Sequence, residues 1–445
     1  MKIKDNCGVF GIYSNKDCVR DILQGIHLLQ HRGQRYGGVA TYNKKNGIRI
    51  ITHRGWVEQK EQDHAFRSEE IKELRANFGI GHVSLKDRQP FLPNIKFNAG
   101  DFTVGFSGKI INAQRLRNML KKEEGLSFNT DIGIIAQLIG RHSDIPSGIE
   151  QIYKQIKGSF ALTVLTGEGI YCARDPYGLK PLILGNRDGT YAGASESRAL
   201  QNLGIPLRRD VLPGEIIFID KNGFKVLKKL KGKRRAYCAF EWAYIASMDS
   251  IIDGIPVKRA RLNLGAKLAR RDRIKADLVA GVPMSGIGHA LGYHYESGIR
   301  YDDVYLYNRY SDRSYTPLEQ KARDAIAKIK LSVIKDSVKG KRIVLCDDSI
   351  VRGTQIREKV KELKAAGVRE VHVRVASPPL MAPCDYGLST RSYRELIAIN
   401  MSIEKIRRYI GATTLKYNAL SDFVEAIGKP ADELCLKCWT NEPVF

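Results

Sequence analysis

Hydrophobic positions in the second half of the chain switch repeatedly between the period of a strand and the period of a helix. The short apolar run at 342–346, RIVLC, is typical of a buried strand. Behind it, Ile356, Val360 and Leu363 recur at the spacing that places side chains on one face of a helix. A second strand-like run, EVHVRVASPP, follows at 370–379. This alternation predicts an α/β domain built on a parallel sheet.

The first half of the chain instead carries many short strand-like segments with few helices between them. These segments lie at 7–12, 79–85, 100–110, 158–165, 169–178 and 189–197. The clearest helical pattern begins at Asp131 and continues through Leu138. Many strands and few helices predict an α+β domain in which stacked sheets are covered by helices.

A basic run, KKLKGKRR at 228–235, separates the two patterns. Beyond it, the helix expected at 258–272 opens the region in which strands and helices alternate. We therefore expect one domain at 7–230 and a second at 231–445. Residues 1–6 are polar, carry no fold signal and are interpreted as a leader.

Length and composition limit the class of protein. The chain has 445 residues, of which 43% are hydrophobic, enough for two or three folded cores. No apolar run has the length of a membrane span or the character of a signal peptide, so we expect a cytoplasmic protein without membrane contact. The formal net charge is +25. A solvated basic surface explains most of this charge and polyphosphorylated substrates explain some of it. Nucleic acid could explain more, but the lack of a helix-turn-helix or zinc-finger pattern disfavours it.

Two adjacent acids follow the strand at 342–346, and a small polar turn follows the acids. Asp347 and Asp348 precede Ser349, and the turn runs through Gly353 to a helix that opens at Thr354. Backbone N–H groups and hydroxyls at such a helix N-terminus form a cradle for phosphate. The paired carboxylates, which we expect on a solvent-facing loop, suit ribose hydroxyls and water-coordinated Mg²⁺.

Eight cysteines are too few for a disulfide scaffold in a chain of this length. Cys435 and Cys438 form a C-x₂-C pair, and Cys238 and Cys384 lie farther upstream. Spacing alone leaves zinc and iron–sulfur equally open.

Several motifs occur in a characteristic order. They are CGVFGI at 7–12, HRGQ at 31–34, GIGHV at 79–83, ARDPYGLKPL at 173–182, ASESRAL at 194–200 and DDSIVRGT at 347–354. With these motifs the chain is identified as a member of the glutamine phosphoribosylpyrophosphate (PRPP) amidotransferase family, in its iron–sulfur, Bacillus-like type. The resemblance implies a pentosyltransferase of the first step of de novo purine synthesis. Its products are 5-phosphoribosylamine, pyrophosphate and glutamate, made by an N-terminal-nucleophile glutaminase domain and a type I phosphoribosyltransferase domain.

The resemblance also assigns the glutamine pocket. Cys7 matches the nucleophile, and removal of the leader would give it an α-amino group with a pKa of about 7.7–8.0 as its own base. Asp131 matches the acid that binds the substrate amino group, and Gly108 matches an oxyanion N–H. Ser84 stands where the family has arginine, and Ser107 stands where it has asparagine. We therefore expect a weakened glutaminase.

In the transferase half the resemblance implies a PRPP site with bound Mg²⁺. Its PRPP-binding residues would be Asp347, Asp348, Ser349, Arg352, Gly353 and Thr354, with Arg309, Tyr310, Arg313 and Lys330 from a closing loop. Ser285 would join Asp347 and Asp348 around the Mg²⁺, in a turn where Met284 replaces the usual acid.

The remaining implied features are a cofactor and partners. The four residues Cys238, Cys384, Cys435 and Cys438 match the ligands of a 4Fe–4S cluster in the family. Purine nucleotides would act as feedback inhibitors, and the chain would form a dimer or tetramer. Two alternatives stay open: a transferase that uses only ammonia, and a PRPP-sensing regulator or nucleic-acid binder built on the same fold.

Overall fold

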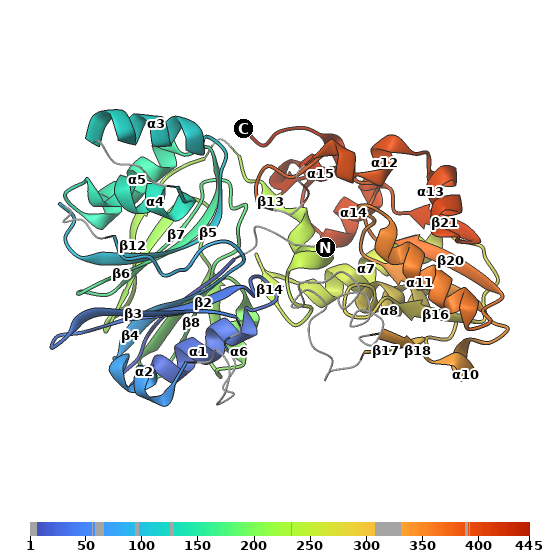
Figure 1. Ribbon diagram of the computed structural model, residues 1–445, viewed down its shortest axis with the longest axis horizontal. Coiled ribbons are helices and arrows are strands. Elements are labelled where there is room, and N and C mark those ends of the chain that lie inside the picture. Colours follow the sequence, from blue (N-terminus) through green and yellow to red (C-terminus); the bar gives the residue numbers. More distant parts are fainter. Residues whose placement is uncertain are drawn as a thin grey trace.

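The computed structural model describes residues 7–445 except 56, 58–65, 94–97, 125–128, 233, 308–330, 388–389 and 391. Two halves lie side by side (Figure 1). The first contains two stacked antiparallel sheets, and the second contains a parallel sheet. Within the described residues, no helix combines the length and apolar character that crossing a membrane would require.

Seven described strands of the first half form one sheet in the order β10-β8-β9-β1-β4-β2-β3. They are β1 Gly8–Tyr13, β2 Tyr36–Asn43, β3 Gly47–Arg54, β4 Phe78–Ser84, β8 Ile183–Arg187, β9 Thr190–Ala194 and β10 Leu207–Asp210. The second sheet has the order β12-β11-β7-β6-β5. Its strands are β5 Phe102–Ile110, β6 Gly158–Thr166, β7 Ile170–Arg174, β11 Glu215–Asp220 and β12 Gly223–Lys229.

Helices cover both outer faces of this sandwich (Figure 1). On the seven-stranded sheet lie α1 Val19–Leu28, α2 Ser68–Glu73 and α6 Ser197–Gln201, and on the other lie α3 Ala113–Glu124, α4 Asp131–Gly140 and α5 Ile145–Gln155. Between the sheets, Val9 and Ile80 from one sheet pack with Leu165 and Ile217 from the other. The expected α+β sandwich of stacked sheets covered by helices is confirmed.

The second half is built on a parallel sheet of order β16-β19-β20-β21. Its strands are β16 Leu278–Gly281, β19 Arg342–Asp347, β20 Glu370–Val375 and β21 Thr414–Tyr417. Val344 and Cys346 face one core, whereas Ile343 and Leu345 face another. Because both faces of the sheet are covered, RIVLC reads as a continuous apolar run, as expected of a buried parallel strand.

Helices and short elements complete this half. The helices are α7 Val257–Arg270, α8 Ile287–Ser297, α10 Lys335–Val338, α11 Thr354–Ala365, α12 Ile397–Asn400, α13 Ile403–Ile410, α14 Leu420–Ile427 and α15 Lys437–Thr440. Short turns are η1 Glu241–Ile245, η2 Tyr393–Glu395 and η3 Ala431–Glu433. Two-stranded pairs join β13 Tyr237–Cys238 to β22 Leu434–Cys435, β14 Ile251–Ile252 to β15 Ile255–Pro256, and β17 Tyr305–Tyr307 to β18 Leu331–Val333. The α/β class predicted for this half is confirmed.

Candidate functional site

The acid pair lies at the carboxyl end of β19, and the turn 349–353 joins it to α11. Gly353 precedes the helix with a left-handed φ of 75°, and a Cβ there would lie 2.9 Å from the side chain of Ile397. Glycine is therefore required for the turn. It leaves the first backbone N–H groups of α11 available to an anion.

Ser285 comes from the turn between β16 and α8 and meets the acid pair. Its Oγ donates a hydrogen bond to Asp347 Oδ1 at 2.7 Å, and the backbone N–H of Asp348 donates to the same oxygen at 2.9 Å. The structure thus brings together the three residues expected around Mg²⁺. Oxygen ligands of this kind suit a hard divalent cation.

Burial raises the pKa of both carboxyls, and for Asp348 the charge of Asp347 raises it further. Asp348 is only 6% exposed, so the expectation that both acids lie on a solvent-facing loop is wrong for it. Its backbone carbonyl accepts from the N–H of Ser377, which holds it against the segment that follows β20. Two buried neighbouring carboxyls are stabilised by a nearby cation.

The other expected PRPP residues differ in their surroundings. Ser349 Oγ donates to Asp348 Oδ2 at 2.5 Å. Arg352 is exposed and forms an ion pair with Glu395, and Thr354 is exposed at the start of α11. The four expected residues of the closing loop, Arg309, Tyr310, Arg313 and Lys330, lie outside the described residues.

Met284 occupies the turn before Ser285 in a left-handed conformation, with φ 71°, and is 75% exposed. Such a φ is uncommon for a residue with a side chain. Gly286, two residues on, packs so closely on β19 that a Cβ would lie 2.0 Å from the carbonyl oxygen of Cys346. The tight turn thus presents an exposed apolar side chain where the family has an acid.

Tyr244 and Arg261 also belong to this site, and the sequence analysis missed both. Burial and the charges of Asp348 and Asp347 raise the pKa of Tyr244, although its side chain is 36% exposed. The charge of Arg261 on α7 lowers the pKa of Asp348. Tyr244 sits on the π-helical turn η1, which has no periodic signature that could have indicated its direction.

Cys7 lies at the start of β1 in the first half and is buried. Its Sγ lies 3.6 Å from Ser84 Oγ, which also accepts the backbone N–H groups of Lys86 and Asp87 at 3.0 and 3.1 Å. Burial raises the pKa of the Cys7 thiol, and Ser84, Lys180 and Lys86 offset part of that rise. The thiol is therefore held mainly in its protonated form.

The remaining residues of the expected glutamine pocket have local partners. Ser107 Oγ donates to the backbone carbonyl of Cys7 at 2.7 Å. Gly108 packs against β6, where a Cβ would lie 1.9 Å from the carbonyl oxygen of Ser159. Asp131 pairs with Arg117 at 3.2 Å. The structure therefore gathers Cys7, Ser84 and Ser107, and holds Asp131 by an ion pair.

The four cysteines expected to bind a metal centre line one cavity between the two halves. With them lie Leu179, Lys180, Phe240, Ile245, Tyr386, Lys437 and Trp439. The pairing of β13 with β22 sets Cys238 directly beside Cys435. No three His, Cys, Asp or Glu side chains in the described part of the chain converge as ligands of one ion.

Comparisons with known proteins cover nearly the whole chain. Residues 78–202 match the model of a glutamine amidotransferase domain. The chain is 38% identical to the amidophosphoribosyltransferase of Methanothermobacter thermautotrophicus, covering 98% of this chain and 94% of that protein. It is 36% identical to that of Bacillus subtilis, covering 99% and 94%. The solved glutamine PRPP amidotransferase of B. subtilis, complexed with ADP and GMP, superposes with a TM-score of 0.90 at 35% identity, covering 98% of this chain and 97% of that one.

Proposed function

The chain belongs to the amidophosphoribosyltransferase family, and we propose that it draws the nitrogen for its reaction mainly from free ammonia. The family activity is transfer of nitrogen to PRPP with release of pyrophosphate, and this chain is an enzyme of that kind. The proposals concern the nitrogen donor, the bound Mg²⁺ and iron–sulfur cluster, and feedback by purine nucleotides.

The ammonia proposal rests on the hydrogen bonds of Ser84 and Ser107, which stand where the resemblance expects arginine and asparagine. Both hydroxyls already bond to nearby backbone groups. Ser84 accepts two backbone N–H groups of its own turn, and Ser107 donates to the backbone of the nucleophile. A serine is too short to hold a carboxylate as a guanidinium fork does. Loss of one oxyanion donor typically costs about 10²–10³ in rate. These contacts support a glutaminase that turns over slowly.

The transferase chemistry is assigned to the acid pair and its neighbours. Asp347 and Asp348 accept hydrogen bonds from the ribose hydroxyls of PRPP, and the N-terminus of α11 holds its 5′-phosphate. Ser285 orients Asp347 through the hydrogen bond at 2.7 Å. Mg²⁺, when bound by these residues, would neutralise charge on the departing pyrophosphate. The buried position of Asp348 helps to exclude water from the reacting carbon.

We propose a 4Fe–4S cluster at the four-cysteine cavity. Four thiolates on one Zn²⁺ would lie about 3.8 Å apart, because zinc–sulfur bonds of about 2.3 Å point to the corners of a tetrahedron. A cubane cluster separates its four thiolates more widely, since each binds a different iron. The position of all four cysteines on one cavity supports a centre that they share. The group would tie Cys238 of β13 to the C-terminal segment.

Two further proposals concern processing and regulation. Removal of residues 1–6 would free the α-amino group of Cys7 as a base for its thiol. Because the B. subtilis relative was solved complexed with ADP and GMP, purine nucleotides are proposed as feedback inhibitors of this chain. A homodimer or tetramer is proposed as its assembled state.

The decisive experiment measures pyrophosphate release from PRPP with ammonium and, separately, with glutamine. The proposal requires release with ammonium that exceeds release with glutamine at saturating donor. Equal rates would contradict the ammonia preference, and release with neither donor would contradict the transferase assignment.

A further inference from the structure

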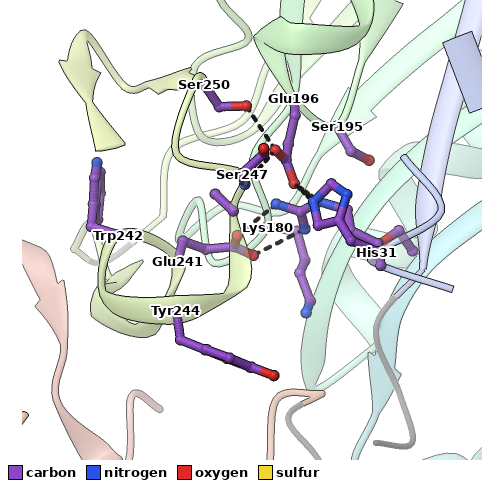
Figure 2. Close-up of polar contacts among 12 residues, drawn as sticks. His31, Lys180, Ser195, Glu196, Glu241, Trp242, Tyr244, Ser247 and Ser250 are labelled. Atoms are coloured by element: carbon purple, nitrogen blue, oxygen red, sulfur yellow. Dashed lines mark hydrogen bonds and ion pairs between the residues drawn. The ribbon is translucent and has the colours of Figure 1, made fainter. Parts of the chain in front are cut away.

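Glu196 lies directly before α6 in the first half, is fully buried, and takes donors from both halves of the molecule (Figure 2). Its Oε1 accepts from His31 Nε2 at 2.6 Å and from Arg32 Nε. Its Oε2 accepts the backbone N–H of Ser247 at 2.9 Å and the hydroxyl of Ser250 at 2.7 Å. The carboxylate is therefore satisfied only while the segment after η1 is docked on the first half.

Arg32 extends this contact to a second buried acid. Its Nη2 lies 2.6 Å from Glu241 Oε2, and its Nη1 lies 3.2 Å from Glu241 Oε1 (Figure 2). Arg32 is 1% exposed and Glu241 is 2% exposed. Fork contacts of this kind fix orientation as well as distance. We call Glu196, Arg32 and Glu241 the ion bridge.

The ion bridge ends on the turn that borders the PRPP site. Glu241 is the first residue of η1. The backbone carbonyl of Ala243 on the same turn lies 3.2 Å from His289 Nε2 on α8, and the turn before α8 carries Ser285, which donates to Asp347 at 2.7 Å. Arg261 braces η1 by donating to the backbone carbonyls of Trp242 at 3.0 Å, Tyr244 at 2.9 Å and Ala246 at 2.7 Å. Figure 2 shows Glu241 at the dashed polar contacts, whereas Tyr244 leaves the same short turn in another direction. A displacement of Glu241 would therefore displace residues that border the PRPP site.

We infer that Arg32 is a positioning residue of the transferase site, acting from the first half through Glu241 on η1, the turn that contacts α8 behind Ser285 and the acid pair. Arg32 belongs to the HRGQ motif, which the resemblance placed with the glutaminase half. Its guanidinium bonds Glu196 in its own half and Glu241 in the other half. The transferase site is thus completed by the first domain whether or not glutamine is used. This inference rests on the transferase reaction proposed at Asp347 and Asp348, and is independent of the nitrogen source.

The test measures PRPP affinity by calorimetry and ammonium-driven turnover in Arg32→Met. Methionine keeps much of the side-chain length and removes the fork. The Kd and KM for PRPP should rise by about tenfold to hundredfold, the range that a displacement of about 1 Å produces in a preorganised site. The KM for ammonium should change much less, because the ion bridge acts on residues that border bound PRPP.

A second variant separates positioning from stability. Arg32→Met alone leaves buried carboxylates without their cation, which is destabilising. The double variant Arg32→Met with Glu241→Met removes one of those charges and should recover thermal stability. PRPP affinity should stay as low as in the single variant, because η1 still lacks the contact between positions 32 and 241 that fixes its position. Affinity that recovers together with stability would overturn the inference.

The chain offers a matched control in another buried ion pair between the halves. Arg174 of β7 contacts Asp253 with Nη1–Oδ1 at 2.7 Å and Nη2–Oδ2 at 2.9 Å, and neither residue lies on η1. Arg174→Met should destabilise the protein comparably and leave the PRPP Kd within about twofold, as expected of an independent site. Equal affinity losses in the two variants, or none in Arg32→Met, would refute the role of Arg32. If the unaltered protein binds no PRPP, the proposed function fails instead.

Discussion

Ser285 Oγ and Asp347 Oδ1 are joined by a hydrogen bond of 2.7 Å although 62 positions separate the two residues in the chain. The contact exists because β16 and β19 are parallel neighbours, with Gly281 beside Cys346. Their carboxyl ends therefore deliver two turns to one edge of the sheet, which is where α/β folds bind their ligands.

The first prediction concerns this acid pair. Asp348→Asn should lower ammonium-driven pyrophosphate release by about 10²-fold, the cost typical of one lost preorganised polar group. The melting temperature of the ligand-free protein should not fall, because the change removes a charge whose burial is unfavourable. Steady-state kinetics and calorimetric scanning measure both effects. A variant with unchanged PRPP turnover would exclude Asp348 from the site.

The second prediction concerns the pH dependence of stability. Burial and the charge of Asp253 raise the pKa of Asp210 to about 6, although Arg174 acts in the opposite direction. The folded state therefore holds this proton more tightly than the unfolded state, whose carboxyl has a pKa of about 3.9. Between about pH 4 and 6 the folded protein loses stability through Asp210 as pH rises, and the loss is complete above that window.

Asp210→Asn should consequently stabilise the protein at pH 8 by roughly 1–3 kcal/mol, since one unit of pKa corresponds to about 1.4 kcal/mol. The asparagine oxygen can still accept the N–H of Asp253, which donates to Asp210 at 2.8 Å. Below pH 4 the variant and the unaltered protein should be equally stable. Urea unfolding at the two pH values measures the difference. If Asp210→Asn stabilises the protein equally at both pH values, the gain in stability does not come from the titration of Asp210.

The sequence indicated the acid pair and its turn because their contacts are local. Asp347, Asp348 and Gly353 lie within one strand–turn–helix unit, and the strand period predicted the sheet that carries it. The burial of Asp348 was missed because it depends on what packs over the turn. The ion bridge was missed for the same reason, since Arg32 and Glu241 are 209 positions apart. Their pairing follows from how the two halves dock, which no periodic pattern records.

The third prediction concerns the four-cysteine cavity. Protein purified without oxygen should contain about four irons per chain and be brown. Cys384→Ala should lose the iron and lower the melting temperature, because the binding energy of a metal centre is also folding energy. Cys172→Ala is the matched control: it truncates a buried thiol in the core between the stacked sheets, and iron content should not change. Zinc in the unaltered protein would contradict the cluster.

The last prediction concerns the nitrogen donor. Ammonium should support more pyrophosphate release than glutamine, because the Ser84 and Ser107 hydroxyls are held by backbone groups. Cys7→Ala should remove whatever glutamine-dependent release the unaltered protein has, and intact mass should show whether Cys7 is its first residue. Ser107→Asn should raise the glutamine-dependent rate if the side chain reaches the oxyanion. If the unaltered protein hydrolyses glutamine at more than about 1 per second, an ordinary enzymatic turnover, the first domain is an active glutaminase and the preference for ammonia is wrong.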